Sequence, residues 1–551
     1  MLYTPFKNPK NRYAFLSEIM RPFLCPLLLI ATAATAQLTE RVEVSIVNVD
    51  VAVTRADGQP IRGLTRNDFE IFEDGKRQAI SNCYAVWSGG LQPSDGGVNA
   101  AAPPDIAPQF RRRVLVLVDV FHTTRNRRAI ALENLERMID ESFNSREYDW
   151  SIGVLGRTVT SVLPLTSDKT AIHNTLARML EISERTTPAM RPDIPTGTPA
   201  TKPGDSAKMP FDLSSDQQIE RALSFDETDR VLQAQFTARA VVDVVRGFAS
   251  TPGKKIVLLL TGDVGMNDLE ITFDNFNAGG GAFFTRPMGP DFERTQREIA
   301  ETRTRIIREA NASGVSLYIF NVEGLNPTGD LGANPTPITN TSAVFWLSKE
   351  TGGRLVTGND AALALHQFDA ASANYYWLGY RPPHPDDGKY HSIQVRLKNV
   401  KGATLDYRTG YSSSQPLAEL ARAMESPIAP TLLTSTLPVS LTAAELQQDR
   451  RGVAVPITVR VPFSALQFLP SDKGVSAAVR IFVSVFDDVG KKLFSGSFPV
   501  PVRLPAPDPG GTLAYKNMVV VGRGVSARIV AAVRDETAEN VGVAEINVRT
   551  P

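Results

Sequence analysis

The side chains that most often perform catalysis are present in this chain, but their spacing matches no common catalytic motif. The sequence contains no Gly-x-Ser-x-Gly nucleophile turn and no His-Glu-x-x-His zinc motif. Its five histidines, at positions 122, 173, 366, 384 and 391, are scattered along the chain. The residues therefore give no support to catalysis, and we expect that the chain is not an enzyme.

Two short segments are similar to ligand-binding loops without completing them. The segment 247–255 reads GFASTPGKK, like a phosphate-binding loop, but its glycines are one residue too far apart and no Ser or Thr follows the lysine. It also precedes an apolar strand pattern, where a phosphate loop would follow one. Asp386-Asp387-Gly388 lacks the later ligands of a calcium loop. Both segments are interpreted as turns.

The composition is that of a globular protein with several domains. The chain has 551 residues, more than one typical core, with 42% hydrophobic and 21% charged residues. Lys plus Arg and Asp plus Glu both number 59, so the basic excess of a nucleic-acid-binding protein is absent. Cys25 lies in a segment that we expect to be removed. The remaining Cys83 cannot form an internal disulfide or a cysteine-based zinc site.

The N-terminal sequence predicts export. From Met20 the chain reads MRPFLCPLLLIATAATAQ, in which Arg21 precedes an apolar run and Ala34-Thr35-Ala36 forms a small-residue cleavage site. The apolar run is too short to span a bilayer, and no other segment is long and apolar enough to do so. We expect a signal peptide over residues 1–36, with Met20 as an alternative start, and a secreted or periplasmic mature protein.

Two β-rich flanks surround a central section of a different pattern. Residues 41–85 alternate apolar and polar positions, with hairpin turns at Asp57-Gly58 and Asp74-Gly75. A second hairpin is expected at 390–411. Each of these flanks is too short for a stable core. We therefore hypothesise that together they complete one small sandwich, with the central section inserted in one of its loops.

The central section alternates strands and helices. Residues 114–120, VLVLVDV, form the near-continuous apolar run that a parallel strand covered on both faces requires, and residues 127–142 follow as a helix. The runs KIVLLL at 255–260 and VSLYIFNV at 315–322 are further buried strands. These repeated units predict a doubly wound, mostly parallel α/β sheet with helices on both faces.

The order of these elements resembles a von Willebrand factor A domain. An apolar strand ends in Asp119, a helix and a β-hairpin pair follow, and the strand KIVLLLTGD comes next. The resemblance covers residues 111 to about 370. The whole layout is similar to von Willebrand factor A-related secreted proteins of acidobacteria, through the segments DGQPIRGLTRNDFEIFEDGKRQ, STPGKKIVLLLTGD and YYWLGYRPPHPDDGKYHSIQVRLK. This smaller family lends no assigned biochemical activity.

The resemblance implies a Mg²⁺ or Mn²⁺ site, which the family builds from Asp-x-Ser-x-Ser, a Thr and a later Asp. Asp119 and Thr123 match the first element, but Phe121 replaces the middle hydroxyl and cannot act as a ligand. The later carboxylate, Asp263, is displaced by one residue, because the sequence reads Thr261-Gly262-Asp263.

The implied ligands of this degenerate site are therefore Asp119, Thr123 and Asp263. Thr186 or Thr187 would supply the threonine of the second loop. The alternative is that the two aspartates cap neighbouring loops. His122 is interpreted as a packed or solvated residue, because Mg²⁺ prefers oxygen ligands.

Three long irregular stretches, at 183–215, 264–290 and 323–340, fall at the C-terminal edge of the expected sheet. Open α/β sheets bind ligands at this edge. Long loops in a compact domain are functional or disordered, and three at one edge favour a recognition surface. Phe283 and Phe284 are candidate anchors for a partner, with the alternative that they pack under their own loop.

These observations predict an α/β domain of von Willebrand factor A or Rossmann-like type flanked by immunoglobulin-like β-sandwiches. The expected parts are a signal peptide (1–36), a β-rich segment (37–90), a linker (91–110), the α/β domain (111–380), a hairpin (381–412), a linker (413–430) and a C-terminal β-sandwich (431–551).

The expected function is that of an exported binding or adhesion protein with a protein or glycan partner and no nucleic acid. The only cofactor that the resemblance implies is Mg²⁺ or Mn²⁺. The alternatives are a structural component of the cell envelope and an enzyme with a loop-borne active site. A deep pocket with convergent polar groups would favour the enzyme, and a broad exposed edge would favour binding.

Overall fold

The computed structural model describes most of the chain from residue 46 onward. The described ranges are 46–56, 58–87, 90–93, 110–120, 122–156, 158–185, 234–262, 290–322, 343–356, 361–413, 415–449, 452–471 and 473–551. The expected signal peptide, Asp263, Phe283 and Phe284 lie outside these residues. Within them, no helix has the length and apolar character needed to cross a membrane.

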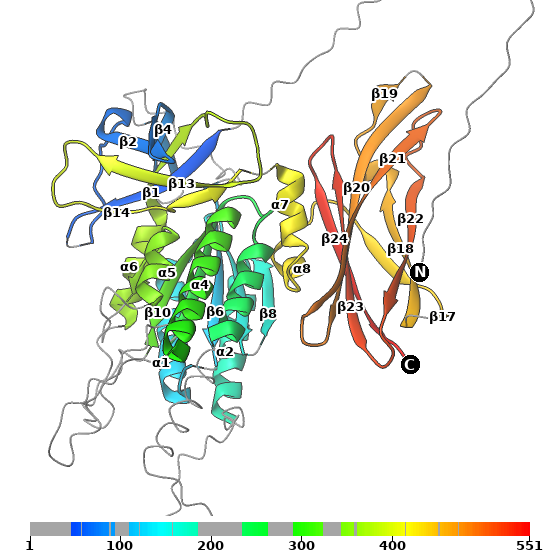
Figure 1. Ribbon diagram of the computed structural model, residues 1–551, viewed down its shortest axis with the longest axis horizontal. Helices are drawn as coiled ribbons and strands as arrows, with labels where there is room; N and C mark the ends of the chain where they lie inside the picture. Colours follow the sequence, from blue (N-terminus) through cyan, green and yellow to red (C-terminus); the bar gives the residue numbers. More distant parts are fainter. Residues whose placement is uncertain are drawn as a thin grey trace, which may run out of the picture. The chain divides into compact units, whose positions relative to one another are not determined.

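Strands from both flanks share the two sheets of a small sandwich (Figure 1). The first sheet has the order β14 (Thr404–Asp406), β1 (Val47–Thr54), β12 (Asn374–Tyr380), β4 (Ile80–Trp87) and β5 (Gly90–Pro93). The second has the order β15 (Gly410–Ser412), β13 (Tyr390–Leu397), β2 (Phe69–Glu73) and β3 (Lys76–Gln78). A short 3-10 helix, η1 (Arg66–Asp68), precedes β2. The central section is thus inserted between strands that pair with one another.

The turn between β2 and β3 shows why the sequence folds in this way locally. Asp74 and Gly75 have φ angles of 45° and 77°. Positive φ at both central residues is the geometry of the two-residue turns that suit the twist of a hairpin, and Asp-Gly is a favoured pair there. The turn also leaves Glu73 at the end of β2 with its side chain directed inward, where it is buried.

The position of β12 corrects the expected end of the α/β domain at residue 380. β12 pairs antiparallel with β1 and β4 and lies in the small sandwich, so the α/β section ends at the preceding helix. Tyr376, Leu378 and Tyr380 are buried in the sandwich core. An apolar strand such as YYWLGY suits either sheet, and only its backbone partners decide to which sheet it belongs.

The inserted section has the doubly wound α/β fold expected from the sequence. Its sheet has the order β11 (Leu355–Val356), β10 (Val315–Asn321), β9 (Lys254–Thr261), β6 (Arg112–Asp119), β7 (Tyr148–Leu155) and β8 (Val159–Thr166). The pairs are parallel except that of β7 with β8. All eight residues of β6 are buried, as expected for a central strand covered on both faces.

Helices cover both faces of this sheet. One face packs against α1 (Arg125–Ser142), α2 (Lys169–Arg185) and α6 (Ala361–Ala373). The other packs against a helix over residues 234–247, α4 (Pro290–Ser313) and α5 (Ala343–Glu350). In chain order the sheet runs 3-2-1-4-5-6, so the order reverses between β6 and β9, the place where such sheets bind ligands.

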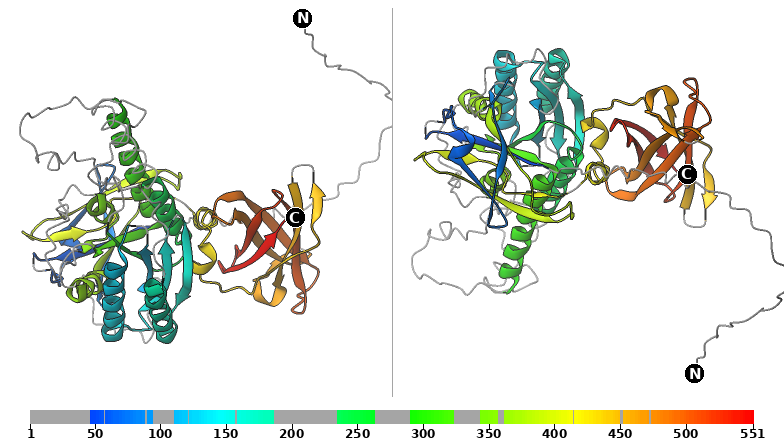
Figure 2. Two further views of the ribbon diagram at one scale, coloured as in Figure 1. Left: turned by 90° about the horizontal axis from the view of Figure 1, so that it is seen from below. Right: turned by 90° about the horizontal axis from the view of Figure 1, so that it is seen from above.

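The C-terminal residues form an antiparallel β-sandwich, as expected (Figures 1 and 2). One sheet contains β16 (Ser440–Ala443), β17 (Gln447–Asp449), β18 (Gly452–Pro462) and β22 (Thr512–Val521). The other contains β19 (Leu469–Ser471), β20 (Gly474–Asp487), β21 (Lys492–Leu504), β23 (Ser526–Asp535) and β24 (Val541–Arg549). Two short helices, α7 (Pro416–Ala423) and α8 (Ala429–Leu432), precede it, and a 3-10 helix, η5 (Phe463–Ala465), follows β18.

Buried cations hold the N-terminal ends of the central strands. Arg112 is 4% exposed and forms ion pairs with Glu147 at 2.8 Å and with Asp369 of α6 at 2.9 Å. Lys254, the first residue of β9, is also buried, and its Nζ lies 3.7 Å from the ring centroid of Tyr375 in β12. Burial lowers the pKa of Lys254 from 10.5 to about 8, although Asp50 acts in the opposite direction.

The lowered pKa of Lys254 predicts how stability depends on pH. Between about pH 8 and pH 10.5, Lys254 is mostly neutral in the folded protein but still protonated in the unfolded chain. The free energy of unfolding of the wild type therefore rises with pH in this window, because the folded protein no longer has to bury the charge. We expect the melting temperature of Lys254→Met, relative to wild type, to be highest at or below pH 8 and to fall toward pH 10.5. The exposed Lys76→Met should show no such trend, and a difference for Lys254→Met that is independent of pH would contradict the assignment.

Candidate functional site

The candidate site lies where β6 and β9 end at the C-terminal edge of the six-stranded sheet. Asp119 ends β6 and Thr261 ends β9, and the two strands are direct parallel neighbours. The hydroxyl of Thr261 donates a hydrogen bond to Asp119 Oδ2 at 2.6 Å. The strand order reverses here, so the connections that leave the two strands diverge to opposite faces of the sheet.

His122 completes the surroundings of the Asp119 carboxylate. Its backbone N–H donates to Asp119 Oδ1 at 2.9 Å, and its ring Nδ1 lies 2.8 Å from Oδ2. Because a carboxylate can only accept, Nδ1 is the ring nitrogen that carries the proton. Asp119 is fully buried, and its charge is compensated by donors from the chain itself.

Thr123 and Arg128 extend this network into α1. The Thr123 hydroxyl donates to the backbone carbonyl of Asp119 and accepts from Arg128 Nη1 at 3.2 Å. Burial lowers the pKa of Arg128, while the charge of Asp119 acts in the opposite direction. The guanidinium therefore supplies positive charge beside the buried carboxylate. We refer to Asp119, His122, Thr123, Arg128 and Thr261 as the Asp119 cluster.

The described residues do not fit a Mg²⁺ or Mn²⁺ ion in this arrangement. A hard cation needs carboxylate, hydroxyl and water oxygens with lone pairs directed at it. The structure brings together two of the expected ligands, Asp119 and Thr123, but Asp119 accepts three hydrogen bonds and the Thr123 hydroxyl is held between a carbonyl and a guanidinium. Asp263, Thr186 and Thr187 lie outside the described residues, so their part in the site stays a prediction.

Sequence reasoning missed three members of the cluster, namely His122, Arg128 and Thr261. His122 was interpreted as a packed or solvated residue, whereas it binds the carboxylate with both its backbone and its ring. Thr261 was passed over in favour of Asp263, although it ends an apolar strand whose neighbour ends in Asp119. The sequence could have indicated Thr261, because the last residues of adjacent parallel strands lie side by side at one edge of the sheet.

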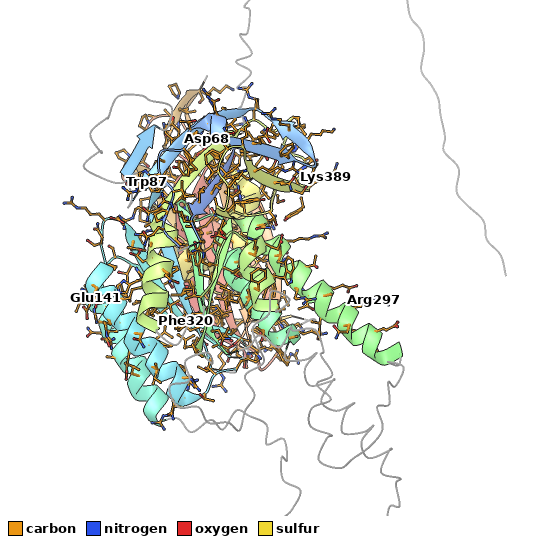
Figure 3. The ribbon with its side chains drawn as sticks, turned by 90° about the vertical axis from the view of Figure 1, so that its left-hand side faces the viewer. Asp68, Trp87, Glu141, Arg297, Phe320 and Lys389 are labelled. Carbon is orange, nitrogen blue, oxygen red and sulfur yellow. The ribbon has the colours of Figure 1, made fainter. Side chains whose placement is uncertain are left out.

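Several strands end at the same edge as the Asp119 cluster, and one helix extends beyond the sheet. β9 and β10 run parallel to β6, so the chain leaves all three strands at the edge that carries the Asp119 cluster. Figure 3 shows α4 extending beyond the sheet, with Arg297 on the extending part. Arg297, Arg305 and Arg308 are exposed, and their spacing places them on one face of α4.

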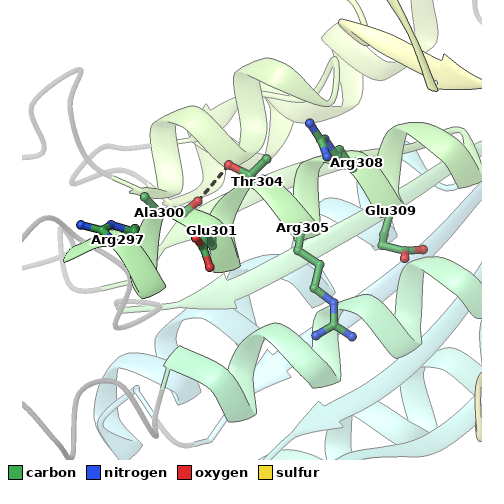
Figure 4. A pocket seen from close by; sticks show the side chains of 7 residues that line it. All are labelled: Arg297, Ala300, Glu301, Thr304, Arg305, Arg308 and Glu309. Atoms are coloured by element: carbon green, nitrogen blue, oxygen red, sulfur yellow. Dashed lines mark hydrogen bonds between the residues drawn. The ribbon is translucent and has the colours of Figure 1, made fainter. Parts of the chain in front are cut away.

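A pocket runs along this face of α4 (Figure 4). The residues that line it all belong to α4: Arg297, Ala300, Glu301, Thr304, Arg305, Arg308 and Glu309. Glu309 is held by Arg246, with contacts of 2.5 and 3.0 Å, and by Arg422 at 3.4 Å. One helix supplies the whole lining, so this pocket lacks the polar groups converging from several elements that an enzyme site would show.

No protein family model and no curated protein matches this chain. Three solved structures give distant likenesses. A β-glucuronidase from Bacteroides uniformis is 11% identical, with a TM-score of 0.16, over 20% of this chain and 13% of its own length. An aerotolerance-related membrane protein from Bacteroides fragilis is 13% identical, with a TM-score of 0.23, over 47% of this chain and 98% of its own.

The third is the pilus adhesin SpaC from Lactobacillus rhamnosus GG, 10% identical with a TM-score of 0.24 over 89% of this chain and 60% of its own length. The chain thus spans only 13% of the β-glucuronidase and 60% of the adhesin. The fold class described above rests on the strand order and pairing of this chain.

Removing the Asp119 carboxylate should destabilise the protein. In Asp119→Ala the hydroxyl of Thr261 and the N–H groups of His122 lose a buried acceptor, and we expect a loss of about 2–4 kcal/mol in the free energy of unfolding. Asp119→Asn keeps one acceptor oxygen and should lose about half as much. Urea unfolding followed by fluorescence measures both, and equal losses for the two variants would contradict the hydrogen-bonded arrangement.

Because the described oxygens are already engaged, millimolar Mg²⁺ or Mn²⁺ should leave the melting temperature unchanged relative to a chelator. A cation that binds only the native state must raise the melting temperature. A rise that disappears in Asp119→Ala would instead show that the site of Asp119, Thr123 and Asp263 holds an ion.

Proposed function

We propose that this chain is an exported binding protein whose partner, a protein or a glycan, is recognised at the C-terminal edge of the six-stranded sheet. The observation that carries this proposal is the Asp119 cluster at the point where the strand order reverses. Its hydrogen bonds hold the turn between β6 and α1 against the ends of two central strands. A rigid edge of this kind is a suitable base for a recognition surface.

The burial of the cluster supports binding over catalysis. A nucleophile must reach its substrate, but Thr261 is 1% exposed and Asp119 is fully buried. The Thr123 hydroxyl donates to a backbone carbonyl, which cannot act as a general base. The polar groups that come together here are therefore used to hold the backbone.

The exposed arginines of α4 support a partner that carries acidic groups. Arg297 lies on the part of α4 that extends past the sheet (Figure 3), and Arg305 and Arg308 follow on the same face toward the small sandwich, where the Arg308 guanidinium lies 6.0 Å from the ring of Tyr390. Guanidinium groups pair well with carboxylates, sulfates and phosphates through two hydrogen bonds at once. Glu301 lies on the same face of α4 and lowers the net positive charge of that face. This mixture of charges favours a specific partner over general attraction to polyanions.

Binding to material from the bacterial envelope tests this proposal. The full chain would be immobilised and exposed to envelope proteins and polysaccharides separately, alongside a variant with Arg297, Arg305 and Arg308 changed to Ser. We expect the variant to bind at least about tenfold more weakly, because each lost charged hydrogen bond contributes about 1 kcal/mol or more.

A matched control changes three exposed cations of the C-terminal sandwich, Arg503, Lys516 and Arg523, to Ser. The control alters the net charge by the same amount and should bind as wild type does. Loss of binding in the control together with full binding in the α4 variant would favour the alternative, a structural envelope component that makes its contacts through the sandwich.

A further inference from the structure

A second polar cluster lies in the small sandwich and has no part in the function proposed above. Glu73 ends β2, His391 lies in β13, and His384 lies in the connection between β12 and β13 that ends at Lys389 (Figure 3). The strands pair with Glu73 opposite Ile393 and with His391 opposite Tyr411. Because side chains alternate along a strand, Glu73, His391 and Tyr411 share the inward face of this sheet.

Glu73 is held in a way that leaves one carboxylate oxygen directed at the histidines. It is 2% exposed, and the hydroxyls of Tyr380 and Tyr411 both donate to its Oε2, at 2.6 and 3.0 Å. Its Oε1 lies 3.0 Å from His384 Nε2. A carboxylate buried to this extent needs hydrogen-bond or ionic partners, and the His384 ring lies directly against its second oxygen.

Both histidines are oriented by their other ring nitrogen. His384 Nδ1 donates to the carbonyl of Pro385 at 2.8 Å. His391 Nδ1 lies 2.8 Å from Asp74 Oδ2, and Asp74 is itself held by the N–H and hydroxyl of Ser392 at 2.9 and 3.1 Å. A metal-binding histidine almost always donates its second N–H to a carbonyl or carboxylate in this manner, which fixes the ring and its tautomer.

The remaining donor atoms of the cluster lie near one another. Donor atoms of Glu73, His384 and His391 lie within 4.8 Å of one another. The two imidazole rings stack at a centroid distance of 3.8 Å, and Asp387 Oδ1 lies 3.2 Å from His391 Nε2. Bonds of about 2.0–2.2 Å from one ion would place adjacent N and O ligands about 3–3.5 Å apart. Binding one ion would therefore bring the donor atoms closer together and rotate the stacked imidazole rings, so that each ring directs a nitrogen at the ion.

The electrostatics of the cluster favour a positive ion. Three carboxylates, from Glu73, Asp74 and Asp387, surround the two imidazoles. Lys389 pairs with Asp387 at 3.4 Å on the exposed side.

We propose that Glu73, His384 and His391 bind a zinc ion, with the fourth position open to water and Asp74 as a positioning residue. Two imidazoles with carboxylates form a ligand set that suits Zn²⁺ and not Mg²⁺ or Ca²⁺, which prefer oxygen alone. The ion joins the end of β2 to the connection that follows β12, and so ties together segments from the two sides of the inserted α/β section.

Zinc binding by the full chain without an affinity tag tests this inference. After treatment with a chelator, titration in a calorimeter should show one equivalent of Zn²⁺ bound, whereas Mg²⁺ at the same concentration should not bind. Cobalt in place of zinc should give the visible absorption of a tetrahedral site with nitrogen and oxygen ligands. Circular dichroism of the metal-free chain checks that each variant is folded.

His384→Ala, which changes a residue outside the strands, should abolish the bound equivalent. Asp74→Asn should weaken binding by about 10–100-fold, because Asp74 orients His391 without touching the ion. The control His366→Ala removes a histidine that pairs with Glu141 at 2.9 Å, away from the cluster, and should leave zinc affinity unchanged. If Zn²⁺ binds no better than Mg²⁺, or if a variant lacking both His384 and His391 keeps the zinc equivalent, the cluster is an ion-pair network and the inference is wrong.

Discussion

The antiparallel pairing of β1 with β12 is the constraint on which the rest of the structure depends. It joins the beginning of the described chain to the strand that follows the α/β section, with Val47 opposite Tyr380. β12 is a central strand and contributes Tyr376, Leu378 and Tyr380 to the sandwich core, so neither flank could form this core alone. Closing a long loop costs entropy that grows only slowly with its length, which makes such an insertion tolerable.

This pairing also decides which edge of the α/β section is joined to the small sandwich. The α/β section begins with β6 and ends with α6, and both ends lie at the N-terminal edge of the six-stranded sheet. Arg112 and Lys254 are buried at this edge, where their charges contact Asp369 and the ring of Tyr375. The opposite edge, with the Asp119 cluster, carries no covalent connection to the small sandwich.

The two polar clusters use buried carboxylates in different ways. The oxygens of Asp119 accept hydrogen bonds from His122 and Thr261 on three sides, so the carboxylate acts as an acceptor that organises the backbone. The hydroxyls of Tyr380 and Tyr411 both donate to one oxygen of Glu73. The other oxygen faces the ring of His384. The two clusters therefore differ in which carboxylate oxygens accept hydrogen bonds, although they contain similar residue types.

The sequence by itself determined the fold class, because buried strands and amphipathic helices leave periodic patterns that are local. It also indicated Asp119 and Thr123, which stand at the end of an apolar strand. It placed residues 374–380 in the wrong sheet, and it did not bring Glu73 together with His384 and His391. Only the tertiary structure decided these points, because the partners of a strand and the register of side chains across a sheet depend on contacts between residues far apart in the chain.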